Sequence, residues 1–172
     1  MAVKDRRKIW FLVMVLVFVV IFNVTLIGTI NGWFGTGKVT IDKEYTCQCG
    51  DNCICSLDYD LLSVEEYEKM AEAGKSFVVF IDQGGCATAD DLEGYADRYA
   101  GEHGIKIFRM VYEDVKESSL GDSVKYYPSV AIVSRGQPFV WLRADSDEDA
   151  PAYNSYEEFE KWMDGWVVEN FS

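Results

Sequence analysis

The sequence contains a single histidine and three prolines, and several common catalytic patterns are missing from it. No Ser/His/Asp set, phosphate-binding glycine loop or catalytic pair of carboxylates is evident. The histidine, His103, falls at the expected end of a helix, where a cation interacts favourably with the helix dipole. The adjacent acids at 90–91 and 157–158 fall in the first turns of expected helices. We therefore expect structural positions for these residues.

Positive charge is also scarce. The chain has 16 lysines and arginines against 29 aspartates and glutamates, a net charge of −13. Without residues 1–8, 12 basic and 28 acidic residues remain, a net charge of −16. This balance argues against binding to nucleic acid or to anionic lipid head groups. It is typical of an acidic, solvated surface that keeps an exported domain soluble.

Charged residues are absent from 9–37, and residues 9–30 are dominated by Val, Leu, Ile and Phe. About 20 such residues suffice for a transmembrane helix. The basic segment 1–8 precedes this stretch, which predicts a cytoplasmic N-terminus and an extracytoplasmic C-terminal domain. A cleaved signal peptide is the alternative, but its apolar region would be shorter and would end at a small-x-small cleavage site. We therefore predict an uncleaved, single-pass membrane anchor at 9–30.

Beyond the anchor, the expected organisation is a linker at 31–46, a cysteine-rich hairpin at 47–55 and an α/β domain at 56–172. Apolar or alternating runs predict five strands, at 57–60, 77–81, 105–112, 130–133 and 139–142. Capping-box patterns at Ser63, Thr88 and Ser155 predict helix starts. Gly74 is expected to end the first helix, and Gly101 and Gly104 the second. A further short helix is expected within 114–126, which gives the order β-α-β-α-β-α-β-β-α.

Cys86 lies between the apolar strand at 77–81 and the start of a helix. At a helix N-terminus, free N–H groups and the helix dipole favour negative charge. A thiol at such a position has a lowered pKa and a larger thiolate fraction. The alternative is a small buried cysteine that acts only as a compact hydrophobic residue.

The other four cysteines are crowded around the turn sequence 50–52, as Cys47, Cys49, Cys53 and Cys55. In a hairpin, Cys49 would meet Cys53 and Cys47 would meet Cys55, which would form two disulfides. An oxidising compartment favours this pairing. A zinc site, or a copper(I) or iron–sulfur group, is the alternative, although zinc usually takes Cys-x2-4-Cys spacing. Reduced thiols, one of which could resolve Cys86, also remain open; no other cofactor is expected.

The segment Val124-Lys-Tyr-Tyr-Pro128-Ser-Val-Ala-Ile-Val-Ser-Arg-Gly136 resembles the thioredoxin segment that contains a cis-proline, then Thr or Ser, an apolar strand and a glycine turn. With a cysteine between the second strand and its helix, roughly residues 57–168 resemble the thioredoxin-like superfamily. The resemblance implies a mixed sheet with helices on both faces. It also implies that Pro128 is cis and lies beside Cys86, with Tyr127 and Gly85 facing the substrate.

The chain departs from the thioredoxin pattern at three places. The family's Cys-x-x-Cys is Cys86-Ala-Thr-Ala89 here, so the resolving cysteine is missing. Gly85 replaces the family's tryptophan, and the family's buried acid falls at Val79 or Phe80. Without a second thiol, a mixed disulfide at Cys86 needs an outside thiol for its release.

The function that these features predict is monothiol thiol-disulfide exchange with envelope or secreted proteins. Its alternatives are a redox-inactive module that binds a partner through its acidic face or the tyrosines 126–127, and a metal-handling protein that uses Cys47–Cys55. The expected partners are protein clients or a membrane complex, and not nucleic acid.

Overall fold

The computed structural model describes residues 37–46, 57–83 and 87–168, and Lys38–Ser172 form one compact unit. Strands and helices alternate along this unit, as the sequence predicts. The strands are β1 (Leu57–Leu61), β2 (Phe77–Asp82), β3 (Ile107–Val111), β4 (Ser129–Ser134) and β5 (Gln137–Trp141). The helices are α2 (Val64–Glu72), α3 (Ala87–His103), α4 (Tyr112–Glu117) and α5 (Tyr156–Trp166), with 3-10 turns η1 (Lys43–Tyr45), η2 (Ser119–Asp122) and η3 (Ala150–Tyr153). The predicted order of strands and longer helices is confirmed.

The five strands form one mixed sheet in the order β1-β3-β2-β4-β5. β3 runs parallel to both β1 and β2, whereas β4 runs antiparallel to β2 and to β5. β2 therefore lies at the centre of the sheet, and all six of its residues are buried. A continuous apolar run such as 77–81 is typical of a strand that is covered on both faces.

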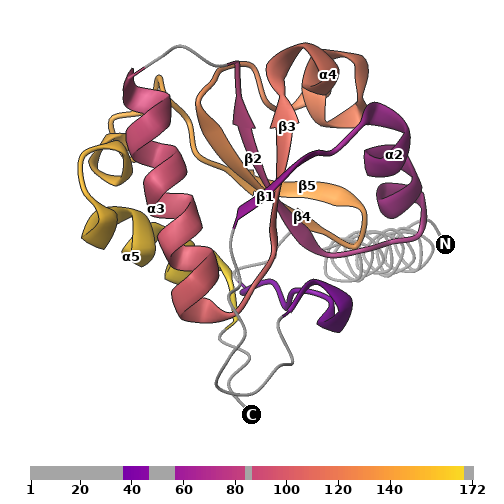
Figure 1. Ribbon diagram of the computed structural model, residues 1–172, viewed down its shortest axis with the longest axis horizontal. Helices are drawn as coiled ribbons and strands as arrows, with labels where there is room; N and C mark the ends of the chain where they lie inside the picture. The colour runs from indigo at the N-terminus through magenta and orange to yellow at the C-terminus, as the bar shows by residue number, and fades with distance from the viewer. Residues whose placement is uncertain (1–36, 47–56, 84–86, 169–172) are drawn as a thin grey trace, which may run out of the picture. The chain divides into compact units, whose positions relative to one another are not determined.

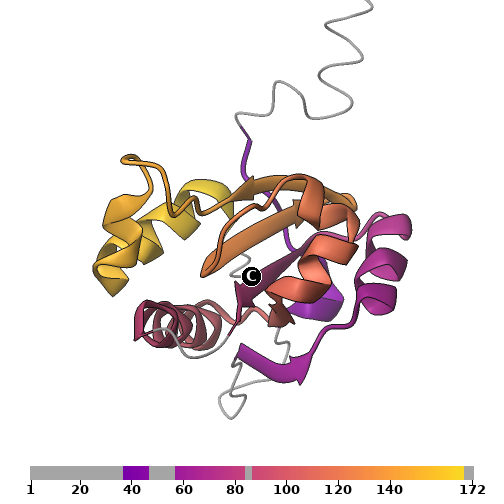
Figure 2. The same cartoon turned by 90° about the horizontal axis from the view of Figure 1, so that it is seen from above.

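Helices cover both faces of the sheet, α3 and α5 on one and α2 and α4 on the other (Figures 1 and 2). Successive residues of β2 point to opposite faces, so one strand contributes to both halves of the core. Val78 and Phe80 pack with α3 and α5, while Phe77, Val79 and Ile81 pack with α2 and α4. The predicted helix-covered sheet is confirmed.

Residues 38–46 pack against the domain, so the expected linker at 31–46 is wrong for this part. Val39 and Ile41 are buried. Val39 exchanges backbone hydrogen bonds with the end of α5, donating to Trp166 and accepting from Val168. The alternation of two apolar residues around Thr40 marks a short extended segment, but its partner lies more than 120 positions downstream, beyond the range of a local pattern.

The capping predictions are confirmed for two helices and need correction for the third. The Ser63 hydroxyl accepts from the Glu66 N–H while Glu66 accepts from Ser63 in return, and the Ser155 hydroxyl accepts from Glu158 N–H. α3 instead begins at Ala87, so Thr88 lies inside its first turn and is not its cap. Gly101 lies within α3 as well. Gly104, with φ +61°, directly follows its last residue.

The β4–β5 hairpin turns at Arg135 and Gly136, both of which have positive φ (52° and 77°). Two successive residues in this region are typical of the tight turn that suits the twist of paired strands. The predicted hairpin is confirmed, with a shorter turn than the expected 134–138. Gly136 also lies close to Ala71 of α2, and its N–H donates to the carbonyl of Lys75, three residues after the end of that helix.

The predicted membrane anchor at 9–30 lies outside the described residues. Among the residues that the structure does describe, no helix has both the length and the apolar character needed to cross a membrane.

Gly136→Ala should lower the free energy of unfolding by roughly 2–4 kcal/mol, because positive φ disfavours a side chain and the site has no room for one. A Cβ at Gly136 would collide with the carbonyl oxygen of Ala71. Gly94→Ala is the matched control, since a Cβ there meets nothing within 4 Å and α3 should gain about 0.5–1 kcal/mol. Urea denaturation of both variants checks this, and equal stability would refute the steric account.

Candidate functional site

The peptide bond between Tyr127 and Pro128 is cis, which confirms the expected geometry of this bond. Pro128 is buried and immediately precedes β4. A proline has no N–H to donate to a neighbouring strand, so the first residue of a strand or the position before it suits proline. The backbone of 127–128 therefore forms a fixed entry into β4.

The β2–β4 register places Pro128 near the end of β2. Ile81 pairs with Ser129 in this antiparallel ladder, so one further step brings Pro128 opposite Asp82. Cys86 comes four residues after Asp82 and one residue before α3. Cys86 and Gly85 lie outside the described residues, so their predicted contact with Pro128 stays a prediction.

Hydrogen bonds from two side chains hold the backbone around Pro128. The Tyr153 hydroxyl of η3 donates to the Pro128 carbonyl at 2.9 Å, and the Ser129 hydroxyl donates to the carbonyl of Leu142 at 2.7 Å. Burial raises the pKa of Tyr153, so its hydroxyl remains a proton donor at neutral pH. The proline loop is therefore anchored to the segment that follows β5.

Two exposed tyrosines directly precede the proline. Tyr126 and Tyr127 are large aromatic residues with exposed fractions of 52% and 40%. The Tyr127 ring contacts that of Tyr112 at 4.8 Å between centroids, and the Tyr112 hydroxyl donates to the Lys125 carbonyl. The predicted substrate-facing residue Tyr127 thus belongs to an accessible aromatic surface beside Pro128.

A buried carboxylate that the sequence analysis missed lies at the end of β2. The Asp82 side chain is 3% exposed and accepts a hydrogen bond from Arg109 of β3 at 2.5 Å. The same guanidinium lies 3.4 Å from Glu93 of α3. Val79 and Phe80, where the thioredoxin pattern would place its acid, are fully buried apolar residues. The buried acid is therefore closer in sequence to Cys86 than expected.

The sheet order, the helices on both faces and the cis-proline before β4 agree with the resemblance found in the sequence. The protein has a thioredoxin-like fold. Solved structures with this fold are similar to it over roughly three fifths of the chain. No family model matches the sequence, and no curated protein matches it either.

Three of these similar structures come from different organisms. The protein Trxlp from Edwardsiella tarda is 11% identical, with 60% of this chain and 95% of that chain covered at a TM-score of 0.45. A single-site mutant of thioredoxin from Halobacterium salinarum is 11% identical, with 63% and 88% covered at 0.46. Thioredoxin f from spinach chloroplast is 14% identical, with 61% and 97% covered at 0.43. At these identities the likeness says nothing about the activity of this chain.

Cys47, Cys49, Cys53 and Cys55 lie outside the described residues, but both flanks of their segment are described. Thr46 forms an isolated bridge with Ile105, and Leu57 pairs with Ile107. The two flanks therefore meet the same short stretch of chain at the beginning of β3.

A cavity of about 540 Å³ opens elsewhere, between η1, α2 and the β1 edge of the sheet. Its lining includes three lysines and an aromatic pair: Lys69, Lys75, Lys106, Tyr45 and Phe108. Neither Pro128 nor Tyr127 lines it, so it is separate from the candidate site.

Arg109→Met should lower the free energy of unfolding by about 3 kcal/mol, because it leaves the Asp82 carboxylate buried without this guanidinium. The double variant Asp82→Asn/Arg109→Met should lose less than Arg109→Met alone. Glu93→Gln is the control, since this more exposed carboxylate contributes less than about 1 kcal/mol. Chemical denaturation of these variants and of Asp82→Asn measures the coupling energy between Asp82 and Arg109. A double variant that loses the sum of the two single losses would contradict this prediction.

Proposed function

We propose that the protein is a membrane-anchored, extracytoplasmic thioredoxin-like protein that exchanges disulfides with protein clients through Cys86. The observation that carries this proposal is the cis-proline Pro128, which the strand register brings opposite Asp82, four residues before Cys86. The 17-residue helix α3 follows Cys86 directly. Its N-terminus favours a thiolate over a thiol.

The proposed reaction is a single exchange step. The Cys86 thiolate attacks one sulfur of a client disulfide, a bond forms between Cys86 and that sulfur, and the other client sulfur leaves as a thiolate that takes up a proton. No electrons are lost from the protein–client pair. In a second step, an external thiolate attacks the client sulfur of the mixed disulfide, forms a new disulfide with it and releases Cys86 as a thiolate. The external thiol is needed because Ala89 stands where a resolving cysteine would be.

The surface beside Pro128 supports a protein client rather than a small molecule. Tyr126 and Tyr127 offer exposed aromatic rings, which contribute large contact areas at protein interfaces. Gln83, three residues before Cys86 in the sequence, donates a hydrogen bond of 2.7 Å from its side chain to Glu113. An extended client segment would lie against the 127–128 backbone, with Gly85 leaving room for it.

The proposed location follows from residues 1–30, whose basic start and apolar run favour a single-pass anchor. For Cys47–Cys55 we propose two disulfides, Cys47–Cys55 and Cys49–Cys53. The described flanks support this pairing, because Thr46 bridges to Ile105 and Leu57 pairs with Ile107, so the two ends of the segment lie near each other. A zinc site formed by the same four cysteines is the alternative, and it would make the protein a metal-handling one.

A redox-inactive interaction module is the second candidate function. It is favoured by the apolar residues Val79 and Phe80, which leave the usual position of the thioredoxin acid without a proton acceptor. In this case the tyrosine surface would bind a partner without covalent exchange.

Incubation of the full chain, purified without reductant so that Cys47–Cys55 and Cys49–Cys53 stay paired, with a disulfide-linked peptide should yield one covalent peptide adduct per chain, at Cys86. The adduct should accumulate because no second thiol resolves it. Cys86→Ser should abolish it, while Tyr127→Ala should slow it and leave alkylation of Cys86 by a small reagent unchanged. Mass spectrometry after acid quenching measures the adduct. No adduct with the unmodified chain would favour the interaction module instead.

Intact-mass counting of free thiols should find one alkylated cysteine in the protein as purified without reductant, and five after reduction in denaturant. The five are the whole cysteine content of the chain. Metal analysis of the same sample is the control. Four or five free thiols together with one bound zinc ion would exclude the disulfides.

A further inference from the structure

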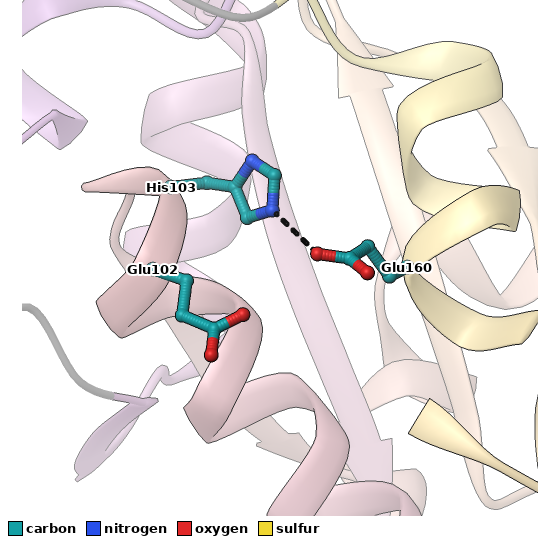
Figure 3. Close-up of side chains that lie close together, drawn as sticks. All are labelled: Glu102, His103 and Glu160. Atoms are coloured by element: carbon teal, nitrogen blue, oxygen red, sulfur yellow. Dashed lines mark hydrogen bonds and ion pairs between the residues drawn. The ribbon is translucent and has the colours of Figure 1, made fainter. Parts of the chain in front are cut away.

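The only histidine of the chain meets two glutamates where α3 and α5 lie side by side (Figure 3). Glu102 and His103 form the C-terminal end of α3, and Glu160 projects from α5. His103 Nε2 lies 3.3 Å from Glu160 Oε1, and one ligand atom from each of the three residues lies within 4.8 Å of the others. The three side chains therefore converge on one point from two helices.

The histidine ring is held in this orientation by its neighbour. Tyr99, one turn earlier on α3, stacks on His103 at 3.9 Å between centroids and an interplanar angle of 15°. The Tyr99 hydroxyl in turn donates to Asp164 of α5 at 2.9 Å. The His103 side chain is only 12% exposed, so this stacking keeps Nε2 directed at Glu160.

The surroundings carry excess negative charge. Arg98 pairs with Glu102 at 2.8 Å, but Glu160 and Asp164 add two further carboxylates to the same network. Hydrogen bonds from Tyr156 and Arg98 lower the pKa of Glu102, which keeps it ionised. The carbonyl groups at the C-terminus of the 17-residue helix α3 add partial negative charge. An acidic residue in the last turn of a helix is unfavourable by itself, whereas a cation bound there would be stabilised.

The distances fit a first-row divalent ion. Zinc binds imidazole nitrogen and carboxylate oxygen at about 2.0–2.2 Å, so two ligand atoms of a tetrahedral site lie about 3.4 Å apart. The separation of 3.3 Å between His103 Nε2 and Glu160 Oε1 already matches such an edge. Glu102, whose side chain is 46% exposed, would turn toward the ion and give up a hydrogen bond from Arg98 or Tyr156 to bind it. One nitrogen and two oxygens favour zinc over magnesium or calcium, which prefer oxygen ligands alone.

We propose that Glu102, His103 and Glu160 bind a zinc-type divalent ion that links the end of α3 to α5, with water completing its coordination. This site uses none of the five cysteines and does not depend on the exchange reaction at Cys86. A protonated His103 paired with Glu160 would produce the same contact without a metal, and the following experiment distinguishes the two.

The full chain labelled with ¹⁵N in histidine reports on this site alone, because it contains a single histidine. Addition of Zn²⁺ should convert the His103 signals to a metal-bound form in which Nε2 no longer carries a proton, whereas excess Mg²⁺ should leave them unchanged. Zinc bound to cysteines elsewhere would not alter these signals. A histidine spectrum that stays the same at a roughly tenfold excess of Zn²⁺ would overturn the proposal.

Glu160→Gln should raise the Zn²⁺ concentration at the midpoint of this titration by about tenfold or more, because it replaces an anionic ligand by a neutral amide. Glu102→Gln should act in the same direction and serves as the second variant if Glu160→Gln fails to fold. Glu157→Gln is the matched control, since it removes one charge from the same helix outside the cluster. A midpoint that Glu160→Gln leaves unchanged, or that Glu157→Gln raises equally, would overturn the proposal.

Discussion

The position of β2 at the centre of the sheet is the constraint from which the candidate site follows. β2 pairs with β3 on one edge and β4 on the other, and the helices cover both of its faces. A one-residue slip of register would exchange the two faces of its apolar run, so the buried pattern fixes the register strongly. That register places the end of β2 at Asp82 beside Pro128, the residue before β4. The relation between the two segments is therefore a consequence of core packing.

The ion pair of Asp82 and Arg109 adds an electrostatic constraint at the same end of β2. A buried carboxylate is costly unless it is paired, and Arg109 supplies both the charge and the hydrogen bond. The pair therefore links the end of β2 to β3. The thioredoxin pattern has a buried acid that assists proton transfer, and this chain has apolar residues at the corresponding positions Val79 and Phe80. Proton uptake by a leaving thiolate in the proposed reaction would then depend on solvent.

Patterns of neighbouring residues were sufficient to predict the parts of the fold that depend on residues close together in the sequence. The apolar run of β2, the Ser63 capping box and the β4–β5 hairpin each depend on residues a few positions apart, and all three were predicted. Asp82 and Arg109 lie 27 positions apart and meet only because Phe80 pairs with Arg109 across two parallel strands. The burial of Val39 depends likewise on the end of α5. Pro128 was an intermediate case, since its cis bond came from a family resemblance and not from its neighbours.

The dipole of helix α3 bears on both proposals, the thiolate at Cys86 and the metal site at its C-terminal end. Its dipole favours an anion at the N-terminus, where Cys86 precedes Ala87, and a cation at the C-terminus, where Glu102 and His103 lie. Seventeen helical residues span about 25 Å, which is several times the screening length of about 8 Å at physiological ionic strength. A metal ion at the C-terminal end would therefore have little direct influence on a thiolate at the other end. Coupling between them would have to pass through the packing of α3 on the sheet, where Leu92, Ala96 and Tyr99 are buried against β2 and α5. Loss of the metal should then alter the anchoring of α3 more than the chemistry at Cys86.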